Sequence, residues 1–117
     1  MFSLSYRLTE DNYQYACSYS ELKEKSGKRI FVDDEEIAVF KVEGNVYAFS
    51  NICPHQKTHL MHEGFVEDRK LFCPVHGWSF DLQTGNISPI RKGLTTYPVK
   101  IVDGDIYIKI SKKEFNW

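Results

Sequence analysis

The sequence lacks the long apolar runs and the excess of positive charge that mark several large classes of protein. Its longest uninterrupted stretches of aliphatic or aromatic residues, such as Ile37–Phe40 and Val46–Phe49, have four residues, whereas a membrane-spanning helix needs about 20. Fifteen Lys and Arg against sixteen Asp and Glu give a formal net charge of −1. Because a broad positive field is missing, we expect neither nucleic acid nor a membrane as a partner.

Cysteine is also scarce. The three cysteines, Cys17, Cys53 and Cys73, are too few and odd in number for a disulfide framework. No basic segment followed by an apolar run, the mark of a secretion signal, opens the sequence. We therefore expect a cytoplasmic, reducing setting, in which the cysteines are candidates for metal or redox chemistry. Cys17 has no second Cys or His at metal-binding spacing and is expected to be a small core residue.

The strand patterns predict one all-β domain. With 117 residues, 42% of them apolar, the chain can bury a core of its own. Short apolar runs separated by turn residues predict a meander of antiparallel strands. These runs are Arg29–Val32, Ile37–Val42 and Val46–Phe49, with turns at Asp33–Glu36 and Glu43–Asn45. Thr95–Val102 and Ile106–Ile110 flank Asp103-Gly104-Asp105 and predict a closing hairpin. Ser20–Lys25 fits a single helical turn, and no long helix is indicated.

Residues 52–92 differ from the rest of the chain, because they hold all four histidines, two of the three cysteines and three of the four prolines. Within them, Cys53-Pro54-His55 and Cys73-Pro74-Val75-His76 form two Cys/His pairs with seventeen residues between. Thiolate and imidazole together bind zinc or an iron–sulfur cluster. Zinc fingers usually pair Cys with Cys and His with His. One Cys and one His in each pair therefore favour a binuclear cluster, with both thiolates on one iron and both imidazoles on the other.

These pairs and their surroundings resemble the Rieske [2Fe–2S] family. The resemblance covers about residues 30–110 and rests on Cys53–Gln56 (CPHQ), Glu63–Val66 (EGFV) and Cys73–Gly85 (CPVHGWSFDLQTG). It implies that Cys53 and Cys73 bind the buried iron of a [2Fe–2S] cluster. It implies likewise that His55 and His76 bind the solvent-facing iron. His59 and His62 lie outside the pattern and are expected to be surface or loop histidines.

The fold implied by the resemblance is a Rieske-type antiparallel β-sandwich or barrel with a small, loop-built cluster-binding subdomain. Residues 1–117 would form a single domain. A cluster-binding lobe of about residues 52–92 would be inserted into a β base made of about residues 5–51 and 93–112.

The residues around the pairs indicate which subclass the sequence resembles. Respiratory-complex members of the family have an added Cys in each ligand loop, and these join in a disulfide. They also have a Ser and a Tyr after the second His ligand, whose hydroxyls stabilise the reduced cluster. Thr58 and Val75 stand at the two Cys positions, and Trp78 and Phe80 at the hydroxyl positions. The sequence therefore resembles the soluble, low-potential ferredoxins.

The function implied is one-electron transfer from a flavin-dependent reductase to a terminal oxygenase, without bond-breaking chemistry of its own. Two alternatives stay open. The ending from Gly93 to Ile108 also resembles the small subunit of an NAD(P)H-dependent nitrite reductase. A zinc-stabilised binding module, which belongs to a different class, would use the same four side chains for structure alone.

Overall fold

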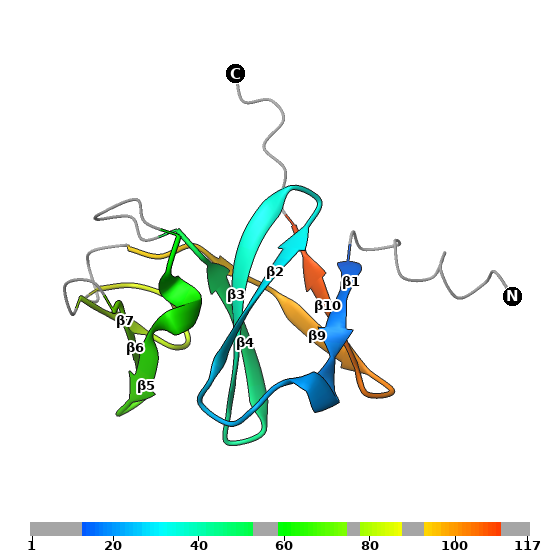
Figure 1. Cartoon of the computed structure of the whole chain (residues 1–117), viewed down its shortest axis with the longest axis horizontal. Coiled ribbons are helices and arrows are strands. Elements are labelled where there is room, and N and C mark those ends of the chain that lie inside the picture. The colour runs from blue at the N-terminus through cyan, green and yellow to red at the C-terminus, as the bar shows by residue number, and fades with distance from the viewer. Residues whose placement is uncertain (1–12, 53–58, 75–77, 88–92, 111–117) are drawn as a thin grey trace, which may run out of the picture.

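The structure is a computed structural model that describes residues 13–52, 59–74, 78–87 and 93–110. Within them, ten strands form three antiparallel sheets (Figure 1). The first sheet has the order β1 (Tyr13–Ser18), β10 (Asp105–Lys109), β9 (Val99–Val102). The second has the order β2 (Gly27–Val32), β3 (Glu35–Val42), β4 (Asn45–Ser50), β8 (Thr96–Tyr97). The third has the order β5 (Phe65–Glu67), β6 (Lys70–Phe72), β7 (Ser79–Asp81). The predicted all-β, antiparallel architecture is confirmed.

The second sheet lies between two hydrophobic cores. The core toward the first sheet contains Cys17, Leu22, Val32, Ile37, Val39, Ala48, Ile106, Ile108 and Ile110. The core toward the third sheet contains Ala38, Phe40, Val42, Phe49, Met61, Val66, Leu71, Cys73, Phe80, Leu82 and Leu94. Successive side chains of β3 alternate between the two cores, because neighbours on a strand point to opposite faces. This two-sided burial explains the uninterrupted apolar run Ile37–Phe40.

Four hairpins close through two-residue turns in which both residues have positive φ. These turns are Asp33-Asp34, Glu43-Gly44, Asp68-Arg69 and Asp103-Gly104. Such turns match the right-handed twist of the flanking strands. The turns predicted over Glu43–Asn45 and Asp103–Asp105 are confirmed in place, although Asn45 and Asp105 already belong to β4 and β10. The acidic turn predicted over Asp33–Glu36 is shorter than expected, because Glu35 and Glu36 already belong to β3.

Two other predicted elements differ from the structure. The segment Thr95–Val102 is not one strand, since β8 pairs with β4 and β9 pairs with β10. Pro98 separates them, because it has no N–H to donate to a ladder; its carbonyl instead accepts a hydrogen bond from the Lys109 N–H at 3.1 Å. The helical turn predicted at Ser20–Lys25 is a 3-10 turn, η1 (Tyr19–Glu21), which begins one residue earlier.

Cys17 lies on β1 and is buried in the first core, as predicted. Burial raises the pKa of its thiol, and the Glu21 carboxylate acts in the same direction, against the opposing charge of Lys28. No helix in the described part of the chain is long and apolar enough to cross a membrane.

A second 3-10 turn, η2 (Met61–Glu63), packs against the second sheet where β2 begins. Gly27 makes this approach possible. A Cβ atom built on Gly27 would lie 2.3 Å from the carbonyl oxygen of His62 and 2.6 Å from the Phe40 ring. Since one of these neighbours is backbone, the contact cannot be relieved by a side-chain rotation.

We therefore expect Gly27→Ala to lower the free energy of unfolding by about 1–3 kcal/mol, the usual cost of forcing extra atoms into a packed site. Denaturant unfolding measures it. Lys28→Ala, which changes an exposed neighbour on the same strand, is the control and should stay within about 0.5 kcal/mol of the wild type. Equal stability of the two variants would contradict the close packing of η2 on β2.

Candidate metal centre

The segment that joins β6 to β7 contains the second Cys/His pair of the sequence. Cys73 follows the last residue of β6, and Trp78 precedes the first residue of β7. The Cys73 N–H donates to the Trp78 carbonyl at 2.8 Å, directly beyond the last ladder pair, Phe72 with Ser79. This bond joins the two ends of the loop between β6 and β7, and we call this pair of residues the loop neck. His76 lies outside the described residues.

Cys73 is only 2% exposed and belongs to the core between the second and third sheets. A thiol at the border of an apolar core suits the buried iron that the sequence predicts for it, because a metal ligand is held still by its packing. Its own N–H is already bonded within the loop neck. The backbone geometry therefore fixes Cys73 independently of any metal.

The loop with the first Cys/His pair is described at both ends. β4 ends at Ser50, and Asn51 and Ile52 lead toward Cys53. The chain is described again from His59, shortly before η2. Cys53 and His55 themselves lie outside the described residues. Among residues that are described, no three His, Cys, Asp or Glu side chains are grouped to hold a metal ion.

The two loops rest on a common support. Met61 of η2, just after the first loop, and Cys73, at the start of the second, are both buried in the same core. Figure 1 shows η2 lying between the third sheet and the second. The residues that flank the two predicted ligand loops are thus held by one packed unit.

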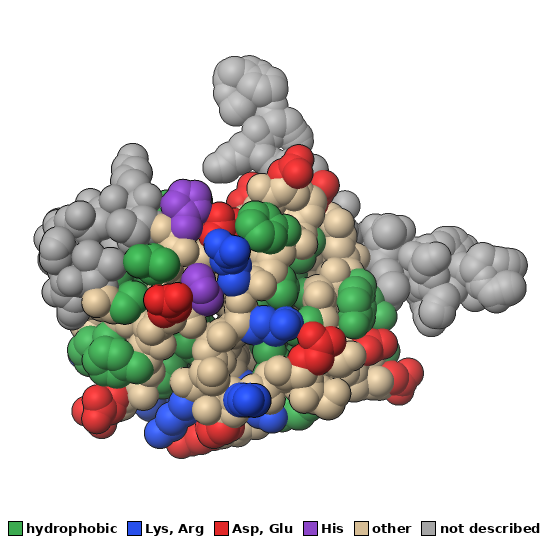
Figure 2. Space-filling model, in the orientation of Figure 1, with side chains coloured by type: hydrophobic (Ala, Val, Ile, Leu, Met, Phe, Trp, Pro, Cys, Tyr) green, Lys and Arg blue, Asp and Glu red, His purple; other side chains and the backbone are tan. Residues whose placement is uncertain are grey.

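His59 and His62 both have hydrogen-bond partners. His59 is 56% exposed, and its Nδ1–H donates to Glu36 Oε1 at 2.7 Å. The Nδ1 of His62 lies 3.1 Å from Asn51 Oδ1, and its Nε2 lies 3.8 Å from Glu63 Oε2. In Figure 2 the described histidines gather on one face, beside the apolar side chains of the third sheet. Each of the two imidazole rings thus has a protein partner and needs no metal to hold it in place.

Glu36 and Asn51 were not singled out from the sequence. Asn51 is fully buried, and its Nδ2 donates to Glu36 Oε2 at 2.7 Å and to the His59 carbonyl at 3.0 Å. Two signals could have found them. Alternation along β3 puts Glu36 on the same face as Ala38 and Phe40. Asn51 is a polar residue two positions before the first Cys of the motif.

The electrostatics of Glu36 follow from these contacts. Burial alone would raise its pKa, but the hydrogen bonds from His59 and Asn51, together with the charges of His59 and Arg29, outweigh burial and lower the pKa below its ordinary value. The carboxylate is therefore the form that the fold stabilises.

The two residues at the hydroxyl positions, Trp78 and Phe80, pack at the core between the second and third sheets. Phe80 lies on β7, is fully buried and pairs across the ladder with Leu71. Its ring is so close to Gly93 that a Cβ there would lie 2.9 Å from the ring. Trp78 packs against the same core. Both side chains supply apolar surface and no hydroxyl group.

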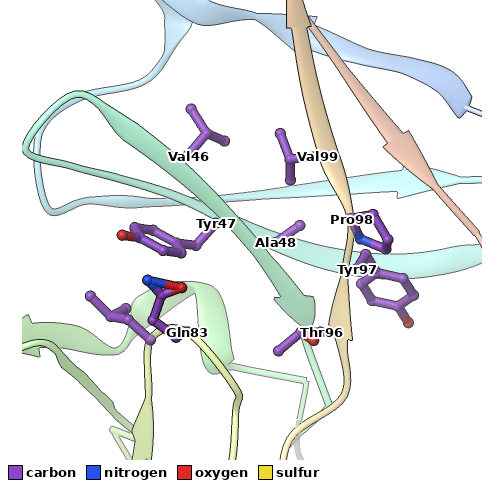
Figure 3. Close-up of a pocket in the computed structure, with 9 residues that line it drawn as sticks. Val46, Tyr47, Ala48, Gln83, Thr96, Tyr97, Pro98 and Val99 are labelled. Carbon is purple, nitrogen blue, oxygen red and sulfur yellow. The ribbon is translucent and has the colours of Figure 1, made fainter.

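A separate open cavity of about 450 Å³ lies between β4 and the β8–β9 segment (Figure 3). In Figure 3 the ring of Tyr47 and the side-chain amide of Gln83 lie close together at one side of it. On the other side, the hydroxyl of Tyr97 donates to Glu35 Oε1 at 3.0 Å. Burial, with the adjacent Glu35 charge, raises the pKa of Tyr97 above its usual range. Cys73 does not line this cavity.

Comparison with known proteins identifies the family to which this chain belongs. Residues 12–98, most of the chain, match the profile of the Rieske [2Fe-2S] domain. The chain belongs to the Rieske [2Fe–2S] family. Its cofactor is accordingly a Rieske-type [2Fe–2S] cluster, and a thiol, such as the buried thiol of Cys73, is the kind of group that such a cluster needs as a ligand.

Relatives match over nearly their full length. The ferredoxin component of the naphthalene 1,2-dioxygenase/salicylate 5-hydroxylase systems of a Ralstonia species is 36% identical over 101 residues, which are 85% of this chain and 96% of the relative. The 3-phenylpropionate/cinnamic acid dioxygenase ferredoxin subunit of Escherichia coli strain K12 is 38% identical over 106 residues, which are 88% of this chain and 98% of the relative.

Two solved structures more than 25% identical to this chain share its fold. A ferredoxin of Sphingomonas yanoikuyae B1 aligns with a TM-score of 0.72 and 27% identity over 86% of this chain and all of its own. A protein proposed to be the small subunit of an NADH-dependent nitrite reductase from Mycobacterium tuberculosis aligns with a TM-score of 0.77 and 26% identity, over 86% of this chain and 96% of its own. The predicted Rieske-type fold is therefore confirmed.

The contacts of Glu36 give a prediction about pH. Glu36→Gln should lower the free energy of unfolding at neutral pH by roughly 1.5 kcal/mol, the lower value for hydrogen bonds to a charged group. Because the pKa of Glu36 is lower in the folded state, its contribution is complete above the ordinary value of 4.5 and is lost as the pH falls through the folded value. The gap between wild type and variant should therefore shrink below about pH 4.5.

Denaturant unfolding between pH 3 and 7 measures this gap. Glu67→Gln removes the same charge at an exposed position of β5 and corrects for net charge. A gap for Glu36→Gln that equals the Glu67→Gln gap at every pH would show that the contacts of Glu36 contribute nothing.

Proposed function

We propose that this protein transfers single electrons as the ferredoxin component of an oxygenase system. The observation that carries the proposal is that two relatives, each a ferredoxin component or subunit of a dioxygenase system, are matched over 96% and 98% of their own lengths. What the chain shares with them is thus nearly a whole ferredoxin.

We also propose that Cys53, His55, Cys73 and His76 hold the cluster, with the two thiolates on the buried iron and the two imidazoles on the outer iron. The burial of Cys73 in a core supports the assignment of the thiolates to the buried iron, and the hydrogen bonds of His59 and His62 to protein groups support leaving these two rings out of the ligand set. When bound, the cluster takes up one electron and releases it again. Four protein ligands would leave both irons with full coordination, so the protein would offer a substrate no open position.

The part played by the chain is to hold the ligand loops still. Cys73 is packed and bonded at the loop neck, and the first loop is anchored at both described ends. Small rearrangement between the two redox states is what makes such a centre suitable for electron transfer. We propose a lobe of about residues 52–92 for this task, on a β base of about residues 5–51 and 93–112.

The proposed partners are a flavin-dependent reductase, which supplies the electron, and a terminal oxygenase, which consumes it. The dioxygenase systems named for the relatives support the oxygenase. We propose the cytoplasm as the compartment, in keeping with the unbridged thiol of Cys17. The chain belongs to a [2Fe–2S] family, which argues against the alternative of a zinc-stabilised binding module.

A nitrite reductase subunit is the second candidate, and the alignment with the Mycobacterium tuberculosis protein favours it. The two functions differ in the electron acceptor. Reduced protein should be oxidised rapidly by a dioxygenase with its aromatic substrate and oxygen, but not by the large subunit of a nitrite reductase with nitrite. The opposite preference would support the second candidate.

The ligand assignment predicts the result of four substitutions. Changing Cys53, His55, Cys73 or His76 to Ala should give protein without the visible absorption and the reduced-state EPR signal of the cluster, because each loop loses part of its metal clamp. The measurements are iron content and spectra of the purified variants.

His59→Ala and His62→Ala are the controls, since each removes an imidazole of the same segment. Both should be purified with the cluster present. If either variant is as colourless as the ligand variants, the assignment of the four ligands is wrong.

A low midpoint potential, about −150 mV at neutral pH, is also expected, near the low end of the Rieske span. Trp78 and Phe80 provide no hydroxyl to the reduced cluster. A hydrogen bond to a charged group contributes about 1.5–3 kcal/mol, and 59 mV corresponds to about 1.4 kcal/mol for one electron. Two missing bonds could thus lower the potential by as much as about 130–260 mV. Film voltammetry measures it, and a value above zero would contradict the low-potential assignment.

A further inference from the structure

We propose that Asn51 is a positioning residue for the first ligand loop: its side chain joins both ends of that loop to β3 and so fixes where the chain presents Cys53 and His55. The inference rests on the proposed ligand assignment. It concerns a residue that binds no metal and acts through the backbone of the loop.

The first argument is the burial of Asn51. It is the one polar residue that is fully buried in the described part of the chain. A buried amide is costly unless its donors and acceptors have partners. Asn51 meets this requirement completely, so its presence in the core is tied to a specific set of neighbours.

The second argument is where those neighbours lie. The Nδ2 group donates to Glu36 Oε2 on β3 at 2.7 Å and to the His59 carbonyl at 3.0 Å. The Oδ1 atom accepts from the His62 N–H at 2.6 Å. Both neighbours of Nδ2 can only accept, which fixes the orientation of the amide.

The backbone of Asn51 is held in the same way. Its N–H donates to the Glu36 carbonyl at 3.0 Å, and its carbonyl accepts from the Met61 N–H at 3.2 Å. Residue 51 is therefore bonded to β3 on one side and to the segment 59–62 on the other. These bonds close a loop whose interior, residues 52–58, contains two proposed ligands.

The third argument is chemical selectivity. An Asp at position 51 would place a carboxylate oxygen against the Glu36 carboxylate and the His59 carbonyl, where the amide now donates. Acceptors would then face acceptors, which is repulsive in a buried site. Adding Glu36→Gln supplies a new donor and lets the pair bond in the reverse direction, while the carbonyl of His59 stays without its former donor.

The test compares four proteins: wild type, Asn51→Asp, the double variant Asn51→Asp with Glu36→Gln, and Tyr97→Phe. Tyr97→Phe is the matched control, because it removes one hydrogen bond to Glu35, the neighbour of Glu36 on β3. Visible absorption gives the rate of cluster loss at a temperature at which far-ultraviolet circular dichroism shows the sheets intact. Voltammetry and EPR report on the cluster that stays bound.

Asn51→Asp should lose its cluster at least about 10-fold faster than wild type, the usual effect of removing a residue that orients metal ligands. The double variant should recover part of this loss. Tyr97→Phe should match the wild type. The EPR signal of Asn51→Asp should also shift, which a purely structural role would not cause while the sheets are intact, whereas the potential is compared only in the double variant, which has the net charge of the wild type.

Several outcomes would overturn the inference. If Asn51→Asp keeps its cluster as long as Tyr97→Phe, or loses it only when the sheets unfold, Asn51 merely stabilises the fold. If Asn51→Asp does not fold, the single variant Glu36→Gln takes its place in the test. Glu36→Gln should then lose the cluster several-fold faster than Tyr97→Phe. Wild-type protein that binds no cluster would contradict the proposed function itself and this inference with it.

Discussion

The burial of β3 on both faces is the constraint on which the rest of the structure depends. Because one strand serves two cores, Ile37 and Val39 hold the first sheet in place while Ala38 and Phe40 hold the third. The third sheet has strands of only three residues and could not stand alone. Its position, and hence that of Cys73, is set by packing against the second sheet. Cys73 is thus held by the β base beneath it.

The same strand also provides the polar support of the site. Glu36 continues the alternation of β3 beyond Ala38, at the border where the core toward the third sheet ends. There it meets Asn51 and His59, and hydrogen bonds replace apolar packing. β3 therefore supports Cys73 through apolar packing and supports the residues that flank the proposed first ligand loop through polar contacts. The two proposed loops follow different strands, β4 and β6, but both are supported by β3.

The sequence predicts the fold class and most strands because their signals are local. Turn residues such as Glu43-Gly44 and alternating apolar residues need no knowledge of distant partners. The chain leaves the second sheet and joins the first at Pro98. This change could not be predicted, since it depends on which strand lies opposite each half of the segment. The roles of Glu36 and Asn51 were missed for the same reason, because 15 residues separate them in the chain. The motif around Cys73 was informative because its spacing reflects the chemistry of the cluster.

The path of the chain from β8 to β9 through Pro98 also affects how the first and second sheets separate when the protein unfolds. One continuous segment is hydrogen-bonded to β4 in the second sheet and to β10 in the first, and the Pro98 carbonyl adds a bond to Lys109 at the crossing. Neither sheet can move away from the other without breaking the bonds of this segment to at least one of them. The β base should consequently exchange its amide hydrogens as a single cooperative unit, in which no sheet opens before its neighbour.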